Sequence, residues 1–188
     1  MRLVLLGAPG SGKGTQGSVL AAHFGVPHVS SGELLRDHVA TDTELGRQVR
    51  AYLERGDLVP DELVLDVVGD AIVAASSYGG YVLDGFPRTL AQAQRAFDRA
   101  ARAGETADAV IYLDVPDDVA RARLGLREQS DRTDDADESA VERRLEVFHA
   151  ETLPLLGFYR ERDVLVPVDA VQPPAAVTAA ILESLEAL

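Results

Sequence analysis

The sequence contains no cysteine, and this absence excludes several kinds of chemistry. Disulfides, thiolate metal sites and cysteine nucleophiles all need cysteine, so none of them can operate here. Asparagine is missing too, so the chain cannot carry the Asn-Lys-x-Asp signature of regulatory GTPases. The lack of disulfides is typical of cytoplasmic proteins, and we expect a cytoplasmic location.

Positive charge is scarce as well. The chain has 18 lysines and arginines against 31 aspartates and glutamates, which gives a formal net charge of -13. Nucleic acids and anionic membranes both need a basic surface, so we expect neither as a partner. If the substrates are phosphates, the arginines must be concentrated in one cleft.

Long apolar runs are absent, because no stretch reaches the roughly 20 apolar residues that a membrane-spanning helix needs. The N-terminus passes from Met1 and Arg2 directly into a short apolar run, so we expect no cleavable signal peptide. With 188 residues, 46% of them hydrophobic, the chain is predicted to form one domain over residues 1–188.

Lysine occurs once, at Lys13, within the sequence Gly-Ala-Pro-Gly-Ser-Gly-Lys-Gly-Thr-Gln of residues 7–16. Glycines at this density allow backbone N–H groups to converge on an anion, and a following helix would direct its positive end to the same place. The spacing from Gly7 to Lys13 fits the phosphate-loop pattern. However, Gly14 occupies the position of the usual hydroxyl, and Thr15 follows one residue later, so a direct hydroxyl ligand to magnesium is not assumed.

Short apolar runs alternate with longer amphipathic segments along the chain. The runs at residues 3–6, 27–29, 81–83, 110–113 and 164–168 are predicted strands, and residues 90–103, 119–126 and 139–148 are predicted helices. This alternation predicts an α/β fold with a parallel β-sheet covered by helices on both faces. Ligands should then bind at the carboxyl ends of the strands.

A second motif, Asp-Gly-Phe-Pro-Arg-Thr, follows the third predicted strand at residues 84–89. It places the Asp84 carboxylate at the end of a strand and Arg88 just before a helix. Magnesium prefers oxygen ligands and keeps several waters, so Asp84 acting through water would suffice to hold it. Arginine is suited to gripping phosphate, and further candidates are Arg36, Arg123, Arg127, Arg132, Arg143 and Arg144.

The remaining residue types suggest no covalent chemistry. The four histidines show no metal-ligand spacing, and no Gly-x-Ser-x-Gly motif or other nucleophile signature is present. A phosphate loop without covalent machinery indicates group transfer by positioning and electrostatics.

With both motifs in this order and separation, the chain resembles the adenylate kinases, which are nucleoside monophosphate kinases, over nearly its whole length. Residues 31–36, 56–60 and 169–173 and Gln92 match further segments of that family. The resemblance implies a P-loop NTPase-like fold with a small helical AMP-binding subdomain at residues 30–59. It also implies the reversible reaction of ATP with AMP to give two ADP, with magnesium.

The resemblance implies a role for each matching residue. The catalytic set would be Lys13, Asp84, Arg88, Arg123, Arg132 and Arg144, with Asp84 holding magnesium through water. ATP would be bound by Gly10, Ser11, Gly12, Lys13, Gly14, Thr15, Arg123, Arg127 and Gln172. AMP would be bound by Ser31, Arg36, Asp57, Leu58, Val59, Gly85, Phe86, Pro87, Arg88, Gln92, Arg132 and Arg144, with residues 57–59 acting through their backbone and Gln92 reading the adenine.

The chain departs from the long form of the family at the lid, which is reduced to a short acidic loop at residues 127–138 without cysteine. It therefore resembles the short-lid form, which binds no zinc. Arg144 precedes Leu145 as in the family pattern, and Arg143 stays the alternative. The substrate alternative is a kinase for UMP or CMP; Thr89 after Arg88 and the spacing of Gln92 favour AMP. The resemblance also suggests a monomer.

Overall fold

The structure is a computed structural model that describes residues 1–126 and 138–188. Its centre is one sheet of five parallel strands: β1 (Arg2–Gly7), β2 (His28–Ser30), β3 (Tyr81–Asp84), β4 (Ala109–Asp114) and β5 (Leu165–Asp169). The strand order is β2-β3-β1-β4-β5, so β1 lies at the middle. Every predicted strand overlaps an observed one, and the predicted parallel sheet is confirmed.

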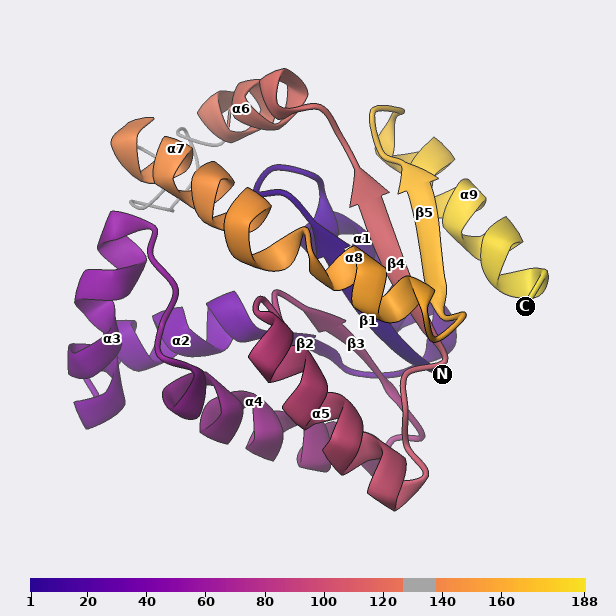
Figure 1. Cartoon of the computed structure of the whole chain (residues 1–188), viewed down its shortest axis with the longest axis horizontal. Helices are drawn as coiled ribbons and strands as arrows, with labels where there is room; N and C mark the ends of the chain where they lie inside the picture. The colour runs from indigo at the N-terminus through magenta and orange to yellow at the C-terminus, as the bar shows by residue number, and fades with distance from the viewer. Residues whose placement is uncertain (127–137) are drawn as a thin grey trace.

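Helices cover both faces of the sheet because its central strands are apolar on both sides (Figure 1). Along β1, Leu3 and Leu5 face one core, which includes side chains of α1 (Lys13–Phe24) and α9 (Pro174–Glu186). Val4 and Leu6 face the other core. That second core is closed by α4 (Asp61–Ser76), α5 (Leu90–Ala103) and α8 (Leu155–Arg160). Alternate side chains of one strand therefore pack against the helical layers on opposite faces of the sheet.

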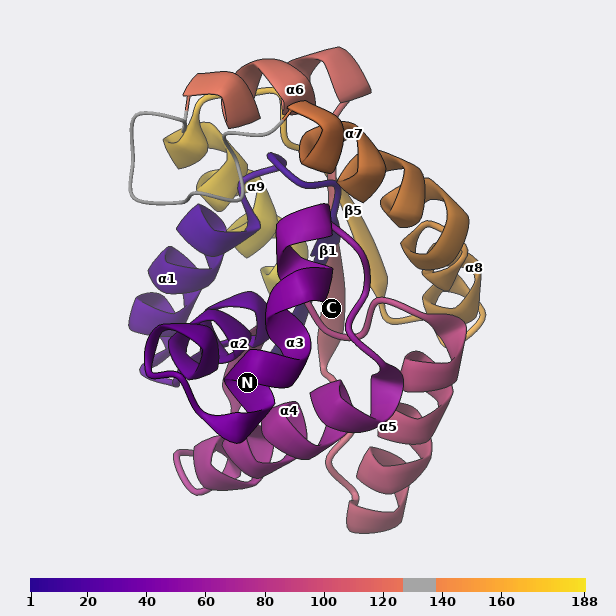
Figure 2. The same ribbon diagram turned by 90° about the vertical axis from the view of Figure 1, so that its left-hand side faces the viewer.

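Two helices, α2 (Ser31–Ala40) and α3 (Glu44–Arg55), form a small insertion between β2 and α4 (Figure 2). Ser30 caps α2 by accepting a hydrogen bond from the N–H of Glu33, and Thr43 caps α3 in the same way. These helices make up most of the segment that the resemblance marks as the AMP-binding subdomain, at residues 30–59.

After β4 the chain forms α6 (Asp117–Gly125), and it continues in the described part with α7 (Glu138–Val147) and the π-helix η3 (Phe148–Thr152). Apart from residue 138, the short lid expected over residues 127–138 lies outside the described residues. No helix in the described ranges is long and apolar enough to cross a membrane.

Candidate active site

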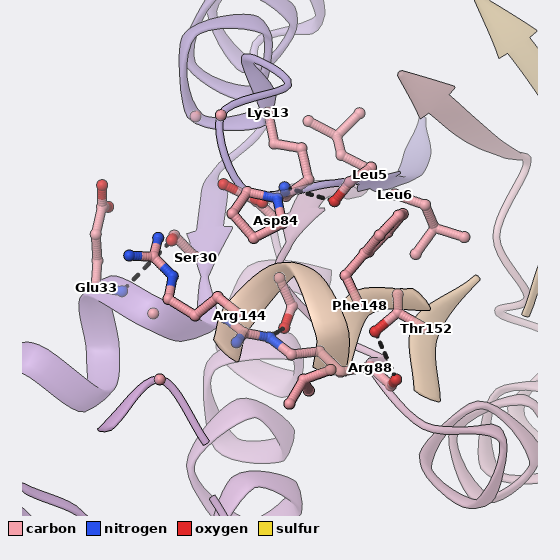
Figure 3. A pocket seen from close by; sticks show the side chains of 18 of the residues that line it. Leu5, Leu6, Lys13, Ser30, Glu33, Asp84, Arg88, Arg144, Phe148 and Thr152 are labelled. Atoms are coloured by element: carbon pink, nitrogen blue, oxygen red, sulfur yellow. Dashed lines mark hydrogen bonds between the residues drawn. The ribbon is translucent and has the colours of Figure 1, made fainter. Parts of the chain in front are cut away.

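A cavity of about 460 Å³ opens at the carboxyl ends of β1, β2 and β3. Its walls come from the phosphate loop, the N-terminus of α2, the loop after α3, the β3–α5 loop and the α7–η3 segment. Figure 3 draws Lys13 and Asp84 in its upper part and Arg88 and Arg144 in its lower part. The expectation that ligands bind at the carboxyl edge of the sheet thus corresponds to a real cavity.

The phosphate loop adopts a conformation that its glycines make possible. Gly10 has a φ of 83° and Gly12 a φ of 97°, which is left-handed backbone. A Cβ on Gly10 would also lie 2.5 Å from the carbonyl oxygen of Ala120. Helix α1 begins at Lys13, so its N-terminal N–H groups face the cavity beside the loop.

Lys13 is held inside this loop. Its Nζ donates to the carbonyl oxygens of Gly7 at 2.8 Å and Ala8 at 2.9 Å. Of the residues expected to bind ATP phosphates, Gly10, Gly12, Lys13, Gly14 and Thr15 line the cavity, whereas Ser11 is buried beneath it. The ammonium group can therefore exchange these carbonyls for phosphate oxygens without leaving the cavity wall.

Asp84 ends β3 at the cavity wall and is 8% exposed. One of its oxygens lies 3.9 Å from Nε2 of His28, whose ring occupies space left by the missing side chain of Gly17. Thr15 lines the same cavity. The oxygens of the Asp84 carboxylate suit a magnesium ion that keeps its waters and binds substrate phosphates. Within the described ranges, no group of three or more His, Cys, Asp or Glu side chains could hold a metal by itself.

Arg88 is fixed at the opposite wall by its backbone and side chain. Its Nε donates to the carbonyl of Gly85 at 2.7 Å, and its own carbonyl accepts from the hydroxyl of Thr152 at 2.8 Å. Burial lowers the pKa of Arg88, and the positive charges of Arg144 and Arg36 lower it further, while Asp84 acts in the opposite direction. Three guanidinium groups therefore share one cavity, where an anion with several oxygens would relieve their repulsion.

Some of the residues that we expect at the AMP site in the β3–α5 loop line the cavity, and others are buried beneath it. Gly85 and Pro87 line the cavity, and Phe86 is buried in the core beneath them. Ser31 is also buried, and its hydroxyl donates to the carbonyl of Gly85 at 2.6 Å. Ser31 thus fixes the loop instead of lining the cavity.

In the loop after α3, too, only some of the expected residues line the cavity. Asp57 and Leu58 line the cavity, whereas Val59 is 5% exposed and belongs to the core. The Asp57 carboxylate accepts hydrogen bonds from Arg55 and Arg143.

The two adjacent arginines of α7 have different surroundings. Arg144 lines the cavity. Arg143 does not line it; its Nε donates to Asp57 at 2.9 Å and its Nη1 to Glu146 at 3.4 Å. The rotation of α7 therefore places Arg144, and not Arg143, at the cavity wall.

Gln92 does not line the cavity. It is 1% exposed in the first turn of α5, with its side-chain amide hydrogen-bonded to Asp61 and to the backbone of Arg88. Two other expected residues lie together at a different place: Arg123 donates to the carbonyl of Val171 at 3.0 Å, next to the exposed Gln172. Arg127 and Arg132 lie outside the described residues.

The sequence profile of the family described as "Adenylate kinase" matches residues 5–164. The chain belongs to the adenylate kinase family. A family member from Trichodesmium erythraeum is 42% identical over 191 aligned positions, covering 99% of this chain and 98% of that protein. Another, from Thermobifida fusca, is 41% identical with 99% and 98% covered, and one from a Synechococcus species is 44% identical with 100% and 95% covered.

The family motifs do not include every residue at the cavity wall. Phe148 and Thr152 of η3 and Leu53 of α3 line it without belonging to any motif quoted from the sequence. Thr152 acts by holding the Arg88 carbonyl. The sequence gives no local signal for these residues, because they reach the cavity only through the packing of α3, α7 and η3 around it.

Proposed function

We propose that this member of the adenylate kinase family catalyses reversible transfer of the terminal phosphoryl group of ATP to AMP, giving two ADP. The observation that carries the proposal is the convergence of Lys13, Asp84, Arg36, Arg88 and Arg144 on one cavity. Four cationic side chains and one carboxylate suit a polyphosphate with a bound divalent cation. The reaction then needs no covalent intermediate on the protein.

On the donor side, the phosphate loop and the N-terminus of α1 bind the ATP phosphates through backbone N–H groups. Lys13 leaves the carbonyls of Gly7 and Ala8, 2.8 and 2.9 Å away, and follows the transferred group as a compact positive charge. Arg123 binds on the ATP side, where it contacts the loop after β5, and a backbone group at Gln172 meets the ATP adenine. Arg127 completes this ATP set in the sequence-based assignment, whereas Arg132 belongs to the AMP-binding and catalytic sets.

On the acceptor side, Arg36, Arg88 and Arg144 hold the AMP phosphate. Arg88 has little freedom, because Gly85 fixes its Nε and Thr152 fixes its carbonyl. A guanidinium that is oriented before the substrate arrives needs little rearrangement during the reaction, and this lowers the barrier to transfer.

Asp84 would hold through water the magnesium ion that accompanies ATP, and that ion would neutralise charge on the phosphate oxygens. The backbone of Asp84 is paired with Leu5 at the end of β3, which keeps its carboxylate near the phosphate loop. We also expect the protein to act as a monomer in the cytoplasm and to use no zinc.

A coupled assay of ADP formation with ATP and AMP, CMP, UMP or GMP tests the substrate. We expect clear preference for AMP; preference for UMP or CMP would instead make the protein a pyrimidine nucleotide kinase. Omission of magnesium should abolish turnover with every acceptor.

The variant Lys13→Ala separates an enzyme from a nucleotide-binding switch. Removing a charge that acts on the transferred group should cost about 3 kcal/mol or more of transition-state stabilisation, which is about a hundredfold or more in kcat/KM. Turnover close to wild type, in a variant with unchanged thermal stability, would contradict the role of Lys13.

A further inference from the structure

The side-chain amide of Gln92 is hydrogen-bonded on both of its ends. Its Nε2 donates to Oδ1 of Asp61 at 2.7 Å, and its Oε1 accepts from the backbone N–H of Arg88 at 2.8 Å. Asp61 is the first residue of α4, and Gln92 lies in the first turn of α5. The contact thus joins the starts of two helices that are 31 residues apart in the chain.

These partners allow only one orientation of the amide. An ionised carboxylate only accepts hydrogen bonds, and a backbone N–H only donates. If the Gln92 amide were turned over, its oxygen would face the Asp61 carboxylate and its NH2 group would face the N–H of Arg88. At a site that is 1% exposed, water could not compensate for these two mismatched pairs.

The Asp61 carboxylate is itself held in place by a second contact. The Thr89 hydroxyl donates to its Oδ2 at 3.3 Å and accepts from the Gln92 N–H at 3.1 Å as the cap of α5. Asp61, Thr89 and Gln92 therefore form a closed ring of hydrogen bonds, and the carboxylate cannot rotate without losing a contact to α5.

A glutamine amide offers two N–H donors and two acceptor sites. After its contacts with Asp61 and Arg88, the Gln92 amide therefore still has one N–H and one acceptor lone pair for a ligand. A donor next to an acceptor complements the adenine edge, where N1 accepts and the 6-amino group donates. Hypoxanthine and guanine have the reverse arrangement, with a donating N1–H and an accepting O6. The orientation of this one amide thus distinguishes 6-amino from 6-oxo purines.

We propose that Asp61 is a specificity-determining positioning residue, which fixes the Gln92 amide in the orientation that accepts AMP and rejects 6-oxopurine monophosphates. The inference rests on the proposed function, in which Gln92 reads the base. Gln92 is covered in this conformation, so a base reaches it only when neighbouring side chains move. The amide is then already oriented, and no binding energy is needed to select its rotamer.

The variant Asp61→Asn tests the proposal with AMP and IMP as acceptors, because these nucleotides differ only at the 6-position and N1. An asparagine of nearly the same shape can donate as well as accept, so it removes one of the two contacts that oppose the turned-over amide and leaves only the N–H of Arg88 to oppose it. The ratio of kcat/KM for AMP over IMP should fall by about tenfold or more, the scale of one two-bond base contact. Calorimetric dissociation constants for the two nucleotides should move in the same direction.

Glu62→Gln is the matched control, because it removes the next acidic side chain in the same first turn of α4 and alters the helix terminus similarly. Its AMP/IMP ratio should equal that of the wild type. Asp61→Ser, whose hydroxyl also donates or accepts, replaces Asp61→Asn if thermal melts show that the latter does not fold.

The experiment distinguishes failure of the role of Asp61 from failure of the proposed function. If the wild-type protein phosphorylates AMP and a folded Asp61 variant keeps the full AMP/IMP ratio, the role of Asp61 is overturned and the proposed function stands. If the wild-type protein does not use AMP, both the proposed function and the role of Asp61 are contradicted.

Discussion

Asp57 and Arg143 form an ion pair of 2.9 Å between residues that are 86 positions apart in the chain. The pair joins the loop after α3 to helix α7, next to Gly56, where a Cβ would lie 2.6 Å from the carbonyl oxygen of Ala140. One edge of the helical insertion at residues 30–59 is therefore fastened to α7, which also carries Arg144 at the cavity wall.

Arg143→Ala should let the insertion move away from α7 more often. The absence of cysteine allows clean labelling, because Gln48→Cys on α3 and Glu151→Cys on η3 would carry the only two thiols. We expect the distance distribution between two labels to broaden toward longer values. The control is Arg121→Ala, which removes an ion pair to Glu142 of α7 but none to the insertion. Equal distributions in both variants would show that the pair has no restraining effect.

The pH dependence of this contact follows from the Asp57 carboxyl. Hydrogen bonds from Arg143 first, and from Arg55 second, lower the pKa of Asp57 below its ordinary value of 3.8. A lowered pKa means that the contact contributes fully above pH 3.8 and is lost as the pH falls through the lowered pKa. NMR titration of the Asp57 carboxyl carbon should give an upward shift of the pKa in Arg143→Ala. In Arg121→Ala the pKa of Glu142 should rise instead, because Arg121 lowers it.

Arg144→Ala should lower activity far more than Arg143→Ala. A guanidinium aimed at a transferring or accepting phosphate contributes on the order of 3 kcal/mol to transition-state stabilisation, so kcat/KM should fall by about a hundredfold or more. Arg143 does not line the cavity and forms ion pairs with Asp57 and Glu146. Steady-state kinetics with both substrates measures the difference, and an equal or larger loss in Arg143→Ala would reverse the assignment.

Two glycines should respond oppositely to alanine. A Cβ on Gly46 of α3 would meet the backbone carbonyl of His38 at the end of α2, so Gly46→Ala should destabilise the protein by about 1–3 kcal/mol. Gly157 of α8 has no atom within 4 Å of an added Cβ, so Gly157→Ala should stabilise by about 0.5–1 kcal/mol. Urea unfolding of the two variants measures both values, and changes of the same sign would contradict the close approach of α2 and α3.

Regular elements were predictable where the sequence signals both a pattern and its ends. Helix α5 runs over Leu90–Ala103, the range expected from its periodicity, and is bounded by the Thr89 cap and by Gly104 in left-handed conformation. The central strands are marked by runs that are buried on both faces. The carboxyl-edge position of Lys13 and Asp84 then follows from parallel pairing of β1 with β3.

The rest of the site depends on the rotation and packing of helices, which composition does not determine. Adjacent arginines in a sequence are about 100° apart on a helix, so the choice between Arg143 and Arg144 depends on the orientation of α7. The support of Arg88 by Thr152 joins residues 64 positions apart. The enclosure of Gln92 by Asp61 is a third contact that no local pattern signals.

The strand order also constrains how the chain matures as it leaves the ribosome. Strand β1, at residues 2–7, pairs on one side with β3 and on the other with β4, which ends at residue 114. The loop that holds Lys13 is thus among the first parts to be synthesised, yet its strand gains both neighbours only after more than half of the chain has emerged. Until β3 and then β4 have emerged, the apolar Leu3–Leu6 stretch lacks one or both of its neighbouring strands, and it is the segment that nascent-chain chaperones would most usefully shield.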